Sequence, residues 1–277
     1  MASHSKTNTN PKRINQNLVQ YARQLRLSGL LASLELRLLE ASTHQLPHEQ
    51  FLELAFQDEL NVRQQRVIDK RTKAAGFRDH KTLEDFDWTF NPAIKRQQMY
   101  ELASGQFIRQ RRDVLLVGAP GLGKSHLAQA IGYHIIKAGF QVVYCSIFDL
   151  VHQLQADQSP AQLDRSLGRY LKPDLLVIDD MGLKILPHKA GEVLFEIVMR
   201  RYENKSTLMT SNRPIEEWGK LLNDVPAATA ILDRFLHHAE IIPMKGRSYR
   251  LRYCGRSQVM EEQPNSGSAP SETENKK

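Results

Sequence analysis

A glycine-rich string, Gly118-Ala-Pro-Gly-Leu-Gly-Lys-Ser125, constrains the fold of this 277-residue chain more than any other feature. It follows an apolar run at 114–117 and precedes a helix-forming run at 126–138, which predicts a strand, a tight loop and a helix. The string matches G-x-x-x-x-G-K-[ST], in which glycines let the backbone wrap closely around phosphate groups. The following helix directs its first N–H groups and its dipole at the same anions. The string therefore predicts a loop that binds a nucleoside triphosphate.

Two residues of this loop have specific expected roles. Lys124 is expected to pair with the β- and γ-phosphate oxygens of ATP, and the Ser125 hydroxyl to hold Mg²⁺. The residues expected to contact the nucleotide are Gly118, Ala119, Pro120, Gly121, Leu122, Gly123, Lys124, Ser125 and His126.

Short apolar runs alternate with helical stretches from residue 113 onward. The five runs expected to be strands are 114–117, 142–147, 175–178, 206–210 and 240–244. Alternation of this kind indicates a parallel sheet with right-handed crossovers, covered by helices on both faces. The predicted fold class is therefore α/β, as a three-layer P-loop NTPase core with a five-stranded parallel sheet.

Two acids close the third apolar run, about 55 residues after the loop. We expect Asp179 to be the carboxylate on the Mg²⁺ side, and Asp180 to orient or deprotonate the water that attacks the γ-phosphate. Asn212 ends the next run and is expected to hydrogen-bond the γ-phosphate or that water. The alternative is that Asn212 only begins the turn before Pro214.

An arginine lies at the end of an apolar helical stretch further along the chain. Arg234 is placed to reach the γ-phosphate of a neighbouring subunit as an arginine finger, or to form a simple ion pair with Asp233.

The N-terminal third is helical in pattern and the most basic part of the chain. Residues 1–113 carry 18 basic and 13 acidic side chains, against 17 and 14 in residues 114–255. The periodicity breaks at Ser28-Gly29, which predicts two helices or one kinked helix, and Pro47 opens a further helix. That helix carries a basic stripe of Arg63, Arg66, Lys70 and Lys73. The stripe is either a solvated helix face or a surface that contacts DNA phosphates.

The motifs, in this order, resemble the AAA+ ATPases and, more narrowly, the IstB/DnaC group. The strings that carry the resemblance, besides the loop and Asp179-Asp180, are Lys81-Thr-Leu-Glu-Asp-Phe-Asp-Trp-Thr-Phe, Leu208-Met-Thr-Ser-Asn-Arg-Pro, Leu232-Asp-Arg-Phe-Leu-His-His and Lys245-Gly-Arg-Ser-Tyr-Arg-Leu-Arg. The resemblance implies the Walker B role for the two acids, sensor 1 for Asn212 and the finger for Arg234. It makes Arg250 the candidate sensor-2 arginine, with Arg247 behind it, although few residues remain after 244 for a C-terminal lid.

The resemblance also implies partners and a reaction. It implies an ATPase that forms homo-oligomers through ATP-bridged interfaces on double-stranded DNA and assists the transposase encoded by the same insertion sequence. Many AAA+ proteins carry Glu where Asp180 stands, and the shorter side chain suits a slow, switch-like ATPase. The region between the second and third runs holds a DNA-contacting helix in related proteins. The corresponding basic residues here are Arg165, Arg169 and Lys172.

Two alternative functions share the same catalytic motifs: a DnaC-like loader of a replicative helicase, and a metabolic P-loop kinase. The expected organisation is a disordered segment at 1–13, a helical DNA- or partner-binding domain at 14–80, a linker at 81–112, the ATPase core at 113–254 and a disordered tail at 255–277. No apolar run reaches the roughly 18 residues of a membrane span, so we expect a cytoplasmic protein without a membrane partner.

Overall fold

The computed structural model describes residues 14–252 except 158 and 188. The two segments expected to be disordered, 1–13 and 255–277, lie outside the described residues. The chain divides into two compact units, Met1–Lys73 and Ala74–Lys277. Each unit is taken by itself below.

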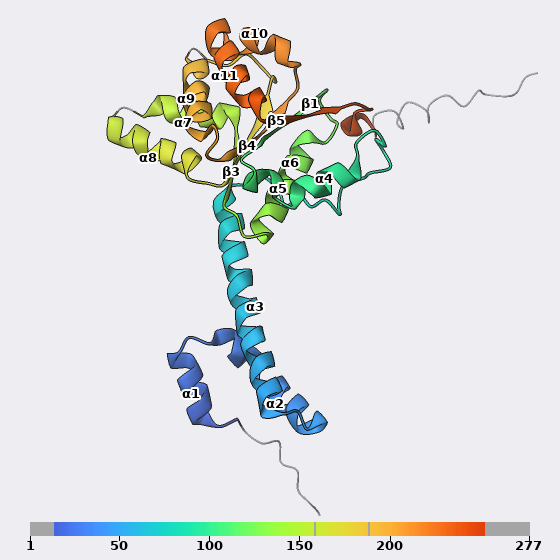
Figure 1. Cartoon of the computed structure of the whole chain (residues 1–277), viewed down its shortest axis with the longest axis vertical. Coiled ribbons are helices and arrows are strands. Elements are labelled where there is room, and N and C mark those ends of the chain that lie inside the picture. Colours follow the sequence, from blue (N-terminus) through green and yellow to red (C-terminus); the bar gives the residue numbers. More distant parts are fainter. Residues whose placement is uncertain (1–13, 158, 188, 253–277) are drawn as a thin grey trace, which may run out of the picture. The chain divides into compact units, whose positions relative to one another are not determined.

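In the part of the first unit that the structure describes, the chain forms α1 (Gln16–Gln24), α2 (Ser28–His44) and most of α3 (His48–Ala75) (Figure 1). The predicted interruption separates two helices rather than kinking one, but it lies at residues 25–27, and Ser28-Gly29 begin α2. A Cβ at Gly29 would lie 2.9 Å from the Glu59 Cα, so glycine lets α2 pack closely on α3. The buried Glu59 carboxylate accepts hydrogen bonds from the backbone N–H groups of Gly29, at 2.6 Å, and Leu30, at 3.1 Å.

The second unit contains a five-stranded sheet with the order β2-β3-β4-β1-β5, and every neighbouring pair is parallel. The strands are β1 (Asp113–Gly118), β2 (Val142–Ser146), β3 (Leu175–Met181), β4 (Ser206–Ser211) and β5 (Ala239–Met244). All five predicted strands are confirmed. The second ends one residue early because the Ser146 hydroxyl accepts the Phe148 N–H and caps the next helix.

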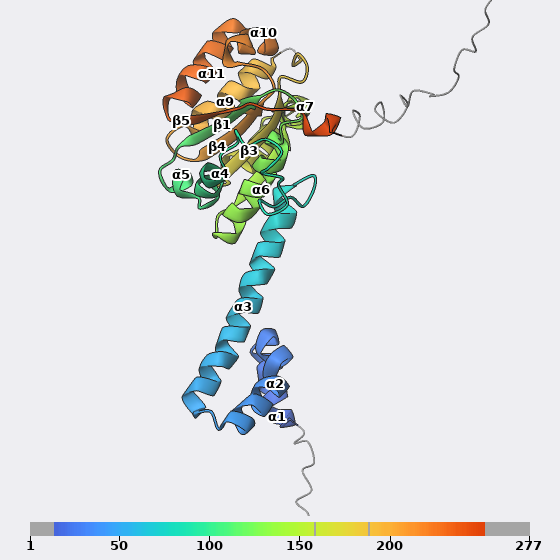
Figure 2. The same cartoon turned by 90° about the vertical axis from the view of Figure 1, so that its right-hand side faces the viewer.

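Helices cover both faces of the sheet, as Figures 1 and 2 show. One face is covered by α6 (Lys124–Lys137), on which α4 (Arg96–Ala103) packs, with the short α5 (Gln106–Arg109) following it. The helices on the other face are α7 (Ile147–Ala156), α8 (Pro160–Leu171), α9 (Ala190–Arg201), α10 (Trp218–Leu222) and α11 (Val225–His237), with the turn η1 (Ile215–Glu217) before α10. The three-layer α/β/α fold class is therefore confirmed.

A bulge interrupts β3 at the two acids. The pairing register with β4 shifts between Ile178 and Met181, and Asp180 lies in the left-handed region with φ +70°. The Asp180 N–H donates to the Thr210 hydroxyl at 3.2 Å, which holds the bulge in place. Because of the bulge, Asp179 is fully buried whereas the Asp180 side chain remains 15% exposed.

The chain beyond β5 is short within the described residues. It forms the turn η2 (Tyr249–Leu251) and reaches residue 252 without a further helix of the size expected in an AAA+ lid. Among the described helices, none combines the length and apolar character required to cross a membrane.

Candidate nucleotide-binding site

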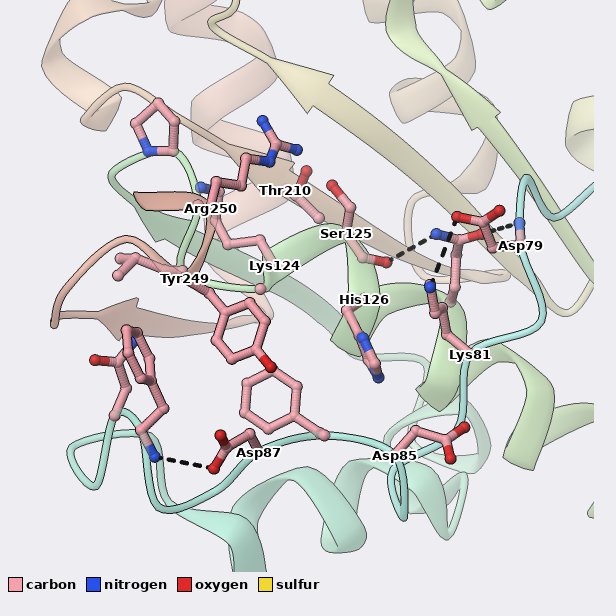
Figure 3. A pocket seen from close by; sticks show the side chains of 18 of the residues that line it. Asp79, Lys81, Asp85, Asp87, Lys124, Ser125, His126, Thr210, Tyr249 and Arg250 are labelled. Carbon is pink, nitrogen blue, oxygen red and sulfur yellow. Dashed lines mark hydrogen bonds and ion pairs between the residues drawn. The ribbon is translucent and has the colours of Figure 1, made fainter. Parts of the chain in front are cut away.

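A cavity of about 620 Å³ opens at the carboxyl ends of the strands, where parallel α/β sheets place their ligands. Figure 3 shows its centre, where α6 begins with Lys124, Ser125 and His126. The predicted site residues that line the cavity are Pro120, Gly121, Leu122, Gly123, Lys124, Ser125, His126, Asp180, Asn212 and Arg250. One cavity thus brings together residues from four motifs that are far apart in the sequence.

The glycine-rich loop has the backbone that phosphate binding requires. Gly121 and Gly123 have φ values of +83° and +94°, and Gly123 immediately precedes α6. The Lys124 ammonium is turned back onto the loop, and it donates to the carbonyl oxygens of Gly118 and Ala119 at 2.8 Å each. Burial lowers the pKa of Lys124 to about 8, against the opposing effect of the Asp179 carboxylate. An anionic phosphate would favour the charged ammonium here.

The Asp179 carboxylate is surrounded by hydroxyl groups. Its Oδ1 accepts from Ser125, at 3.0 Å, and from Thr210, and its Oδ2 accepts from Tyr144 at 2.5 Å. Burial, together with the Asp179 charge, raises the pKa of the Tyr144 hydroxyl well above its usual range, so it stays a donor. A carboxylate and a serine hydroxyl this close together form a hard oxygen donor set that fits Mg²⁺.

Two segments that flank the core form walls of the cavity: residues 79–91, which we call the strap, and residues 245–252, the C-terminal segment. A Cβ on Gly123 would lie 2.5 Å from the Phe86 ring, so the strap packs directly on the loop. The Tyr249 N–H donates to the Gly121 carbonyl at 2.9 Å. Asn91 joins the two walls, because its side chain exchanges two 2.9 Å hydrogen bonds with the backbone of Arg247.

Comparison with known proteins identifies the family. The protein-family model described as IstB-like ATP binding protein matches residues 20–257 of this chain. The chain belongs to this family. Two relatives at 37% identity bear the names of ATP-binding proteins of insertion sequences. One, of IS5376 from Geobacillus stearothermophilus, aligns over 76% of this chain and 84% of its own length. The other, of IS21 from Pseudomonas aeruginosa, aligns over 83% and 86%.

A solved structure is similar to the IstB-like chain in fold. The AMPPCP-bound DnaA from Aquifex aeolicus has a TM-score of 0.51 and 19% identity, over 67% of this chain and 56% of that one. This likeness supports the three-layer α/β fold of the second unit.

Several predicted residues of the IstB-like chain lie outside the cavity lining. Gly118 and Ala119 hold Lys124 through their carbonyls, and Asp179 lies behind Ser125. Arg234 is 46% exposed on α11 and forms a 2.9 Å ion pair with Asp233. That ion pair is the simple alternative raised above, and it leaves the arginine accessible.

The basic stripe on α3 is partly engaged within its own unit. Arg63 pairs with Glu59 at 2.6 Å, and Arg66 donates to the Ser28 hydroxyl at 2.7 Å. Lys70 and Lys73 are exposed. On and next to α8, Arg165 and Lys172 are exposed as well, whereas Arg169 also donates to the Gln153 side chain at 3.2 Å.

The motifs did not reveal several residues of the site. Tyr144 and Thr210 lie within strands, where their hydroxyls look like ordinary strand positions, yet both donate to Asp179. Gln129 lies one turn into α6 and accepts two backbone N–H groups of the chain just after α3. Arg78, in the same short segment after α3, forms an ion pair with Asp180. Only their position relative to the motif residues in space marks them.

Proposed function

We propose that this IstB-like protein is an ATP-dependent regulator that assembles on double-stranded DNA and assists its partner transposase. The observation that carries the proposal is one cavity lined by Lys124, Ser125 and Asp180, with Asp179 bonded to Ser125 directly behind it, in a chain of the IstB-like family. The names of its relatives connect them with ATP and with insertion sequences. That connection favours the transposase partner over a replicative helicase.

The residues of the cavity support hydrolysis of ATP. Lys124 would leave its loop carbonyls for the β- and γ-phosphates, and Ser125 and Asp179 would hold Mg²⁺, which neutralises phosphate charge when bound. Asp180 would accept a proton from the attacking water while the oxygen of that water bonds to the γ-phosphorus. The bond from that phosphorus to the bridging oxygen breaks, and ADP leaves with the electron pair. Asn212 would orient this water.

Arg234 supports an ATP-bridged assembly. It lies in the last turn of α11, shortly before β5 starts, whereas the cavity lies where the strands end. A half-exposed arginine at the opposite end of the sheet serves a second copy better than its own cavity. Assembly of this kind would align the exposed cations Arg165 and Lys172 of successive copies of the second unit along the phosphates of duplex DNA.

The Asp180→Asn variant tests the reaction. Asparagine keeps the shape of the side chain but is not a base, so we expect hydrolysis to fall by about 100-fold or more while ATP binding persists. Steady-state phosphate release and the binding of a fluorescent ATP analogue measure the two effects. Unchanged hydrolysis would remove Asp180 from the mechanism.

The assembly is tested with the same variant, since it should hold ATP without turning it over. Gel filtration and sedimentation with a duplex DNA should show large complexes with ATP that are absent without nucleotide and persist longer for Asp180→Asn than for wild type. Arg234→Ala should bind ATP but not assemble. If ATP changes neither the size of the protein nor its DNA binding, the proposed function is wrong.

A further inference from the structure

The second acid of the site is held by an arginine that belongs to none of the motifs. The Arg78 Nη2 lies 2.7 Å from the Asp180 Oδ2. Asp180 lines the cavity, whereas Arg78 approaches it from outside the lining and remains 48% exposed. Asp180, the expected base, is therefore already paired with a cation of the protein before any nucleotide binds.

The backbone around Arg78 is fixed to the start of the helix that follows the phosphate-binding loop. The N–H groups of Arg78 and Asp79 both donate to the Gln129 Oε1, at 3.0 and 3.1 Å. The Gln129 amide in turn donates to the Ser125 carbonyl at 3.2 Å. The position of Arg78 thus depends on the same turn of α6 that carries the phosphate- and metal-binding residues.

The residues just before Arg78 connect it to α3 through a constrained turn. Gly76 has φ +76°, a conformation that favours glycine. The Phe77 ring packs on Tyr144, 5.9 Å between centroids, and would lie 3.0 Å from a Cβ at Gly132. Arg78 follows the last residue of α3, Ala75, by only three positions. A displacement of the end of α3 would therefore act on Arg78 across only two intervening residues, Gly76 and Phe77.

The ion pair opposes the chemistry expected of Asp180. A carboxylate that accepts the proton of a water must present a free oxygen to it in the right direction. Here the Oδ2 is occupied, and the guanidinium fixes the orientation of the carboxylate. Arg78 also lies 5.9 Å from the ring of Tyr144, the donor to Asp179, so its positive charge is close to both acids.

We propose that Arg78 is a positioning residue that restrains Asp180, and that its release couples DNA binding by the α3 helix to ATP hydrolysis. This inference rests on the proposed function. In the free protein the ion pair keeps hydrolysis slow. Duplex DNA bound along the basic stripe of α3 shifts the end of that helix, Arg78 withdraws, and the Asp180 carboxylate becomes available to the attacking water.

The Arg78–Asp180 ion pair contributes little to folding stability, so a change in activity after its removal can be attributed to the site. An ion pair whose arginine is half exposed contributes little to folding, so a variant at this position should fold normally. Arg200 offers a matched control, because it is 51% exposed and forms a 2.6 Å ion pair with Glu196 on α9, away from the cavity lining.

The experiment measures steady-state hydrolysis by the full-length protein, alone and with a duplex oligonucleotide. We expect Arg78→Ala to raise kcat without DNA by about fivefold, with KM for ATP unchanged, and to reduce stimulation by DNA to the same extent. Arg78→Lys, which keeps the charge, should remain near the wild-type rate, and Arg200→Ala should match wild type throughout. The double variant Arg78→Ala, Asp180→Asn should lose the gain.

Two results separate this inference from the proposed function. If wild type hydrolyses ATP in an Asp180-dependent way but Arg78→Ala is no faster, or is slower, the restraint by Arg78 is wrong and the ATPase assignment stands. If wild type shows no Asp180-dependent hydrolysis with or without DNA, both are wrong. A change in KM alone would also overturn the inference, because it would place Arg78 in nucleotide binding instead.

Discussion

The two ends of the sheet both bury charged side chains, but they satisfy them with different kinds of partners. Arg201 and Asp113 lie at the end where the strands begin, and Lys124 and Asp179 lie at the end where the strands finish. All four are buried, and the most exposed of them, Asp113, is only 8% exposed. Burial by itself therefore does not distinguish a structural charge from a functional one.

At the first end, the partners are mainly backbone groups that the fold already fixes. The Arg201 guanidinium donates to the carbonyl oxygens of Tyr170, at 2.8 Å, and Pro173, at 3.1 Å, and to Ser206. Asp113 accepts the Thr207 N–H at 2.6 Å. These bonds connect the end of α8, α9 and strands β1 and β4, and nothing in the reaction requires them to break.

At the second end, the partners are groups that can move. Lys124 is bonded to two carbonyls of the glycine-rich loop, and Asp179 to three hydroxyls, each of which can turn to another partner. We expect these partners to be exchanged when a nucleotide binds. The exchangeability of the partners, rather than the depth of burial, therefore marks the site where a ligand belongs.

Among the substitutions that test this comparison, we expect the greatest loss of folding stability at Arg201. Arg201→Leu should lower the free energy of unfolding by about 3–5 kcal/mol, because several buried acceptors lose their donor and the buried Asp113 loses a nearby positive charge. Urea denaturation measures the change. Arg200→Ala, its neighbour on α9 with an exposed ion pair, should shift stability by less than about 0.5 kcal/mol. A small effect of Arg201→Leu would show that this end is as adaptable as the other.

The next effect concerns Lys124, which is as deeply buried as the charges of the first end. Lys124→Met should weaken ATP binding by about 100-fold or more, since the β- and γ-phosphates lose their cation. The stability of the nucleotide-free protein should change by less than about 1 kcal/mol, because a buried ammonium with an unfavourably lowered pKa is removed.

Fluorescent-nucleotide titration and urea denaturation measure the two quantities on the same sample. Normal ATP binding by Lys124→Met would contradict the assignment of the loop. A loss of stability as large as that of Arg201→Leu would instead erase the contrast between the two ends of the sheet.

The sequence was enough to predict the fold of the second unit. The five apolar runs and the helix after the glycine-rich loop carry strong period and turn signals, and the observed strands differ from the predicted ones only by small shifts at their ends. The left-handed Asp180 and the bulge were not predictable, because they depend on the Thr210 hydroxyl of the adjacent strand. Periodicity does not encode a contact between two strands.

The candidate site was predictable where a motif fixes the geometry locally. Lys124 and Ser125 follow their loop directly, and Asp180 and Asn212 end neighbouring strands, so all four were expected near one cavity and line it. Tyr144, Gln129 and Arg78 come from elements that meet the site only after folding, and no spacing in the chain relates them to it. The roles of the site residues in the reaction remain proposals.

The last prediction tests whether Asp113, at the end of the sheet where the strands begin, makes the free energy of unfolding depend on pH. Burial raises the pKa of the Asp113 carboxyl to about 7, against the opposing effects of the Thr207 N–H, Arg201 and His238. The unfolded chain has the ordinary value of about 4, so between these values the folded protein binds one proton more. The contribution of Asp113 to stability is therefore complete below pH 4 and is lost as the pH rises through about 7.

The matched variants are Asp113→Asn and Asp113→Ala, because only asparagine keeps an oxygen for the Thr207 N–H. With Asp113→Asn, the free energy of unfolding should fall less between pH 5 and pH 8 than in wild type, by about 2.5 kcal/mol. Asp113→Ala should show the same flattening, together with a loss of stability at every pH. Urea denaturation at pH 5, 6.5 and 8 measures both. If Asp113→Asn keeps the wild-type pH dependence, the carboxyl is ionised throughout and the attraction of the Arg201 charge outweighs its burial, which would make Asp113 a fixed negative charge at this end of the sheet.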